Sequence, residues 1–92
     1  MRHTRSAEVM ICNRRGLHAR AAALFAKTAQ EFNAEVTVIK ADFAVDGASI
    51  MDLMMLAAGA GTALRIEAVG VDAEAALAAL VALVEAGFHE RG

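Results

Sequence analysis

The spacing of apolar residues along this chain switches repeatedly between the period of a helix and the period of a strand. Apolar residues three and four apart predict helices over residues 19–32, 50–58 and 73–87. Short β-branched or alternating segments predict strands over residues 7–12, 35–40, 43–45 and 63–69. The order β-α-β-β-α-β-α predicts an α+β fold, with three helices on one face of a four-stranded, mostly antiparallel sheet.

The domain organisation follows from the length of the chain. It has 92 residues and no repeated, proline-rich or low-complexity segment, so we expect one domain that spans residues 1–92. The ends are polar, and we expect a flexible extension at residues 1–6 and a flexible tail at residues 89–92. Hydrophobic residues make up 58% of the sequence, which suits the efficient core that so small a domain needs.

The composition excludes several classes of protein. A net charge of −2 and the absence of Trp and Tyr argue against a nucleic-acid partner. The apolar runs are too short for a membrane span or a signal peptide, so we expect a soluble, cytoplasmic protein without a membrane partner. Cys12 is the only cysteine, and we expect a buried free thiol. His3 and His89 are expected to be solvated, with no metal site and no cofactor.

One histidine, His18, lies at the predicted start of a helix, directly after a loop that contains Gly16. The first N–H groups of a helix lack internal partners and carry partial positive charge, which makes such an end suitable for phosphate. Arg20 adds a guanidinium, and the basic pair Arg14-Arg15 adds to the positive field. A neutral imidazole is also a nucleophile. The pattern indicates a phosphate-handling site, and a capping or surface histidine remains the alternative.

Two stretches of the sequence resemble a known family. Gly16-Leu17-His18-Ala19-Arg20 is similar to the active-site motif of HPr, the histidine phosphocarrier family of the bacterial phosphotransferase system, commonly Gly-Leu-His-Ala-Arg-Pro. Residues 49–56 resemble the regulatory serine and short helix of the same family. The resemblance extends over about residues 7–88 and implies the open-faced β-sandwich of that family.

The resemblance implies a role for each matching residue. His18 would accept a phosphoryl group on Nδ1 from enzyme I, which takes it from phosphoenolpyruvate, and would pass it to an EIIA-type acceptor. Arg20 would interact with that phosphate and with partner proteins, and Leu17 would contribute to partner binding. The chain would then be a monomeric carrier and not an enzyme.

Ala21 departs from the family motif, which usually has proline at this position. Proline in the first turn is pre-organised for a helix and lacks an N–H that would otherwise be unpaired. Ala21 therefore retains an extra donor at the start of the helix and gives up some rigidity.

Ser49 has two interpretations. It is placed to cap the second helix, with Asp52 three residues on in a variant of the capping box. The resemblance adds a second role, as the residue modified by HPr kinase/phosphorylase. Asp46 and Asp52 are near in sequence and would repel a phosphate on Ser49.

The second helix is too rich in apolar residues for all of them to be buried. Leu53 and Leu56 are the expected core members, which leaves Ile50, Met51 and Met54 near the surface. An exposed apolar patch of this kind usually marks a partner site, and methionine adapts to several partners. The alternative is that Met51 or Met54 closes the core.

The sequence leaves two further choices open. The carrier could serve sugar uptake or a nitrogen-related regulatory chain, and the motifs do not separate these branches. A second class of function is a non-covalent regulatory binding module that uses the Ile50–Met54 surface. An enzyme is disfavoured because no acid–base partner for His18 is visible in the sequence.

Overall fold

The computed structural model describes residues 3–91, and its elements follow the predicted order. The strands are β1 (His3–Met10), β2 (Glu35–Lys40), β3 (Phe43–Asp46) and β4 (Ala63–Gly70). The helices are α1 (Ala19–Gln30), α2 (Ile50–Met55) and α3 (Ala73–Glu85), followed by a short 3-10 helix, η1 (Gly87–His89). The predicted helix starts coincide with those observed, and the predicted C-terminal ends lie two to three residues beyond them.

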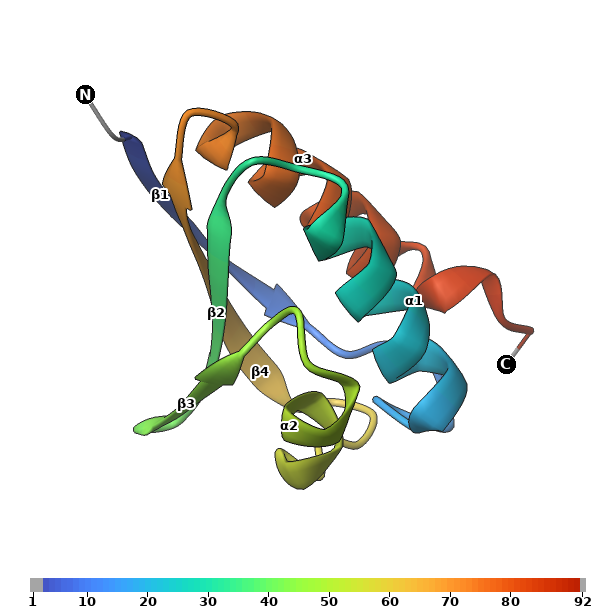
Figure 1. The fold of residues 1–92 in the computed structure, drawn as a ribbon. Helices are drawn as coiled ribbons and strands as arrows, with labels where there is room; N and C mark the ends of the chain where they lie inside the picture. The colour runs from blue at the N-terminus through green and yellow to red at the C-terminus, as the bar shows by residue number, and fades with distance from the viewer. Residues whose placement is uncertain (1–2, 92) are drawn as a thin grey trace.

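The four strands form one sheet in the order β1-β4-β2-β3, and all three pairings are antiparallel. The helices lie against one face of this sheet, as Figure 1 shows. The α+β prediction is therefore confirmed. Strand β4 illustrates why the alternating pattern identifies the two faces of the sheet. Leu64, Ile66 and Ala68 are buried beneath the helices. Arg65 and Glu67 point to the other face and form an ion pair.

Strand β1 begins earlier than the sequence predicts. His3 pairs with Gly70 and Met10 pairs with Ala63, so the strand occupies residues 3–10 in place of 7–12. The expectation of a flexible extension is wrong for residues 3–6, and residues 1 and 2 lie outside the described part. The signal was weak because β1 is an edge strand in which Thr4, Arg5 and Ser6 are polar and exposed, and the apolar alternation therefore begins only further along.

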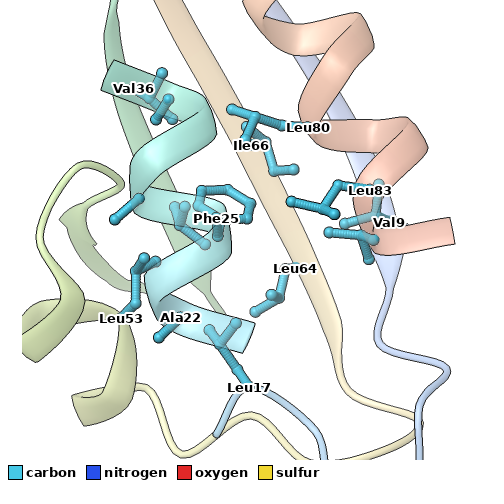
Figure 2. Packing of buried hydrophobic residues seen from close by; sticks show 14 of the residues in the cluster. Val9, Leu17, Ala22, Phe25, Val36, Leu53, Leu64, Ile66, Leu80 and Leu83 are labelled. Carbon is cyan, nitrogen blue, oxygen red and sulfur yellow. The ribbon is translucent and has the colours of Figure 1, made fainter. Parts of the chain in front are cut away.

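The core lies between the helices and the sheet. Phe25 of α1 and Leu80 of α3 lie close to Ile66 of β4, and Leu53 of α2 lies on the other side of α1 (Figure 2). On α1, residues three and four apart form the buried stripe Ala22, Phe25, Ala26 and Ala29. On α3, Leu80 and Val84 are buried, while Leu77 and Val81 are half-buried.

The C-terminal segment is not the free tail that the sequence suggests. Gly87 adopts a positive φ of 63° and turns the chain after α3, and Phe88 then packs into the core. Glu90 follows and reaches the start of α1, where it contacts His18 and Asn13. A glycine turn and one buried aromatic side chain therefore fold residues 89–91 back onto the domain; residue 92 lies outside the described part.

One smaller expectation is wrong, and one helix start has an unusual cap. Cys12 is exposed, because it lies beyond the end of β1, and its thiol donates to the carbonyl of Val84 at 3.4 Å. Asp72 occupies the N-cap position of α3, but its carboxylate accepts from the backbone N–H of Asn33 at 2.7 Å and not from α3. Asp72 thus ties the segment that follows α1 to the start of α3.

Across residues 3–91, every helix falls short of the length and hydrophobicity that a bilayer span requires.

Candidate functional site

His18 is the N-cap residue of α1, and the loop before it is held in one conformation by close backbone contacts. Gly16 adopts a φ of +66°, and a side chain there would lie 2.4 Å from the carbonyl oxygen of Ala58. The N–H of Leu17 donates to that same carbonyl at 2.8 Å. The loop that follows α2 therefore fixes the backbone immediately before His18.

The start of α1 offers several N–H groups. The first hydrogen bond of the helix runs from the N–H of Ala22 to the carbonyl of His18 at 2.8 Å. The N–H groups of Ala19, Arg20 and Ala21 precede this bond and are left over for another acceptor. Ala21 itself is buried, so the methyl group that replaces the usual proline ring packs inward.

The imidazole of His18 contacts a carboxylate from the far end of the chain. Its Nε2 atom forms a short hydrogen bond with Oε2 of Glu90, and both side chains are only 16% exposed. The other carboxylate oxygen, Oε1, accepts from Nδ2 of Asn13 at 2.9 Å. The same Nδ2 donates to the carbonyl of Gly16 at 2.8 Å. Asn13, Glu90 and His18 thus form a continuous polar chain.

The charge of Glu90 follows from this arrangement. The hydrogen bond from Asn13, and then that from His18, holds the pKa of the Glu90 carboxyl below its ordinary value, and Arg15 contributes in the same direction. These neighbours stabilise the ionised form because each offers a proton or a positive charge to the carboxylate. Glu90 is therefore a carboxylate at neutral pH.

Arginines line a hollow beside this carboxylate. Arg15, Arg20 and Arg91 form it together with Phe88, His89 and Glu90. Arg20 is exposed in the first turn of α1. Guanidinium groups bind phosphate oxygens with paired hydrogen bonds, so the hollow has the chemistry of an anion-binding surface.

Ser49 caps α2 as the sequence predicts. Its Oγ accepts from the N–H of Asp52 at 3.2 Å. The Asp52 carboxylate does not return to Ser49 but accepts from the N–H of Asp46 at 3.4 Å, so only half of the capping box forms. Asp is one methylene shorter than the Glu that usually completes this motif.

The apolar residues of α2 divide between core and surface. Leu53 is fully buried and Leu56 nearly so, whereas Met51 is 73% exposed. Ile50, Met54 and Met55 are exposed as well, and we call these four exposed residues the α2 patch. The predicted exposure of Ile50, Met51 and Met54 is confirmed, and Met55 is exposed beside them. Leu17 is only 6% exposed and belongs to the core (Figure 2), so the structure does not place it on the surface as the partner-binding expectation requires.

Asn13 and Glu90 are the site residues that the sequence analysis misses. They are 77 residues apart, and neither belongs to a recognisable motif. The one available signal was the pair Gly87-Phe88, because a glycine followed by a large apolar residue suggests a chain that turns back to bury a side chain. In the described part of the chain, no group of three or more His, Cys, Asp and Glu residues is arranged to hold a metal ion.

Together these features define a small α+β domain with a histidine at the N-cap of a helix, beside N–H groups that the helix leaves over. The family model described as "PTS HPr component phosphorylation site" matches residues 5–86. The chain belongs to this family of phosphocarrier proteins.

Three similar proteins illustrate the match. Phosphocarrier protein NPr of Shewanella violacea is 46% identical over 83 residues, 90% of this chain and 91% of that protein. Phosphocarrier protein HPr of Neisseria meningitidis serogroup A is 48% identical over 82 residues, 89% of this chain and 92% of that protein. The crystal structure of HPr-C-His from Thermoanaerobacter tengcongensis is 40% identical, with a TM-score of 0.92 over 96% of this chain and 99% of that one.

Family membership settles the broad function. The chain is a phosphocarrier of the phosphotransferase system and is not an enzyme.

Proposed function

We propose that this protein accepts a phosphoryl group on His18 from phosphorylated enzyme I and passes it to an EIIA-type acceptor. The observation that supports this most directly is the position of His18 as the N-cap of α1, next to three N–H groups that the helix does not use. Phosphoryl transfer asks little of a protein beyond positioning and charge stabilisation. The start of α1 offers both.

The arginines supply the remaining charge. A phosphoryl group on the imidazole carries about two negative charges, which the N-terminal end of α1 stabilises through its dipole. Arg20, exposed in the first turn of the helix, can reach phosphate oxygens and also meet a partner protein. Removal of Arg20 should therefore slow both receipt and delivery of the group.

The α2 patch is the proposed partner surface. The backbone contact between Leu17 and Ala58 keeps the end of α2 next to the loop that presents His18. A relay needs complexes that form and separate quickly, and a small apolar surface rich in methionine suits several partners in turn. Leu17 is buried and is not part of this proposed surface.

Ser49 is a proposed regulatory site for HPr kinase/phosphorylase. A phosphate on Ser49 Oγ would give up the cap on the Asp52 N–H and would add charge next to Asp46 and Asp52. Modification would therefore alter α2 at the edge of the proposed partner surface.

The test is a reconstituted transfer chain. Phosphoenolpyruvate labelled with ³²P is incubated with enzyme I, this protein and an EIIA-type acceptor, and the label is followed on a gel. We expect label on the acceptor only when this protein is present. The sugar-system and nitrogen-system donors and acceptors are used in separate reactions, and the pair that transfers faster identifies the branch. No label on the acceptor with either set would contradict the proposal.

Two properties of the proposed carrier accompany this role. We expect it to act in the cytoplasm, where the donor and acceptor meet, and to elute as a monomer in size-exclusion chromatography.

A further inference from the structure

We infer that Glu90 is a positioning residue for His18: held by Asn13, it keeps the proton of the neutral imidazole on Nε2 and leaves Nδ1 as the atom that receives the phosphoryl group. This inference rests on the proposed role of His18 and names the device that selects the reacting atom. Glu90 touches neither donor nor acceptor in this account, so it acts through His18.

The orientation of Asn13 follows from its neighbours. Its side chain is 97% buried, with 3% of its surface exposed, and it faces two oxygen atoms, the Gly16 carbonyl and Oε1 of Glu90. Both neighbours accept hydrogen bonds, so the amide nitrogen must face them and the amide oxygen must point away. Within residues 3–91 that oxygen, Oδ1, has no donor. The two bonds from Nδ2 therefore determine how Asn13 sits.

The proton on His18 follows in turn. An ionised carboxylate has only lone pairs to offer, so the short bond between Glu90 Oε2 and His18 Nε2 requires a proton on Nε2. A neutral imidazole carries one proton, so Nδ1 then holds the free lone pair. The polar chain from Asn13 through Glu90 thus selects one of the two tautomers.

The transfer step uses this arrangement without moving a proton. The Nδ1 lone pair attacks the phosphorus of the phosphorylated donor, the new Nδ1–P bond forms, and the bond from phosphorus to the donor atom breaks. The electron pair of that bond returns to the donor. The proton stays on Nε2, and the ring gains positive charge as the bond forms. The Glu90 carboxylate faces that developing charge and stabilises it.

The fold of the C-terminal segment holds Glu90 in a fixed position next to His18. Gly87 turns the chain, Phe88 is buried, and the backbone N–H of Glu90 donates to the carbonyl of Gly87 at 3.0 Å. Glu90 is therefore presented from an anchored turn and not from a loose end. This anchoring distinguishes it from an incidental surface carboxylate.

The substitution Glu90→Gln should reverse the tautomer. Asn13 Nδ2 still needs an acceptor, so the amide oxygen of the new glutamine side chain should turn toward Asn13. The NH₂ group of the same glutamine then faces His18. His18 Nε2 must then accept, which moves the ring proton to Nδ1 and removes the lone pair that attacks phosphorus. Glu90→Ala removes the partner without supplying a donor, so its effect should be smaller. Glu85→Gln is the matched control, because it removes the same charge from an exposed site at the end of α3.

Two measurements separate this role from a structural one. The first is the ¹⁵N chemical shifts of the His18 ring in the unphosphorylated protein, recorded at an alkaline pH where the shifts no longer change with pH. The second is the initial rate of phosphorylation by enzyme I. We expect the Nε2–H tautomer in the wild type and in Glu85→Gln, the Nδ1–H tautomer in Glu90→Gln, and transfer slower by about 10- to 100-fold in Glu90→Gln.

The outcomes are distinguishable. A wild-type tautomer in Glu90→Gln, or a reversed tautomer with an unchanged transfer rate, would overturn the inference. Slower transfer in Glu90→Gln with the wild-type tautomer would also overturn it, because the effect would then arise elsewhere. If the wild type accepts no phosphoryl group, the proposed function fails, and the ¹⁵N comparison alone still decides whether Glu90 orients the ring.

Discussion

Replacement of Gly16 by alanine perturbs the loop that presents His18, and the structure allows its effect to be estimated. The residue has a φ of +66°, and an added Cβ would lie 2.4 Å from the Ala58 carbonyl oxygen and 2.8 Å from Cα of Gly59. Both neighbours are backbone atoms, so the contact is relieved only by movement of a loop. That movement separates the N–H of Leu17 from the Ala58 carbonyl, which it now meets at 2.8 Å.

The expected loss of stability combines two contributions. The left-handed conformation costs an alanine about 1–2 kcal/mol, and the lost hydrogen bond costs about 0.5–1.5 kcal/mol. Gly16→Ala should therefore lower the free energy of unfolding by about 1.5–3.5 kcal/mol, before any further cost of moving the loop. For a domain of this size that corresponds to a fall in Tm of about 6–28 °C.

Two other glycines provide matched controls. Gly61 has a φ of +87° and open space around its Cβ position, so Gly61→Ala should lose only the conformational contribution. Gly59 has open space and no positive φ, so Gly59→Ala should be neutral or slightly stabilising. Stability is measured by urea denaturation followed by circular dichroism. If Gly16→Ala is as stable as Gly61→Ala, the claim that the Ala58 loop fixes the backbone before His18 is refuted.

Three further predictions concern α2 and the end of the chain. Ser49→Ala removes the Oγ cap and should lower the free energy of unfolding by about 1 kcal/mol, whereas Ser49→Thr should largely retain it, as urea denaturation would show. Leu53→Ala opens a cavity in the core and should lower the free energy of unfolding by about 2–5 kcal/mol. Met51→Ala should change the free energy of unfolding by less than about 0.5 kcal/mol, but it should weaken the binding of enzyme I measured by calorimetry. Equal losses of stability in the two variants would contradict the division of α2 between core and surface. The pKa of Glu90 is lower in the folded protein than its ordinary value of 4.5. The ionised Glu90 should therefore stabilise the fold fully at pH values above 4.5, and this stabilisation should disappear as the pH falls through the lowered pKa. The stability difference between the wild type and Glu90→Gln should therefore vanish in acid, and a difference that persists at low pH would contradict this.

The elements that the sequence predicts well are those in which burial imposes a period. Strand β4 alternates Leu64, Ile66 and Ala68 with polar residues, because one face meets the helices and the other meets solvent. The stripe of α1 is recognisable for the same reason. Strand β1 was shortened in the prediction because its first residues, at the edge of the sheet, contribute hydrogen bonds to β4 but little apolar surface.

The site was predictable only where it is local in sequence. His18 and Arg20 lie within one short motif, and Ser49 lies at a helix start, so position along the chain was enough to single them out. The contact between His18 and Glu90 joins residues 72 apart and depends on the turn at Gly87 and the burial of Phe88. No local pattern encodes such a contact, and a polar C-terminal segment suggests a free tail until the fold places it.

The central claim is that His18 carries the phosphoryl group, and intact-mass spectrometry tests it most directly. The wild type and His18→Ala are each incubated with phosphoenolpyruvate and enzyme I, and the mass of each protein is measured before and after brief acid treatment. The account predicts one added phosphoryl group on the wild type, lost in acid, and none on His18→Ala. An unmodified wild type, or an equal added mass on His18→Ala, would contradict it.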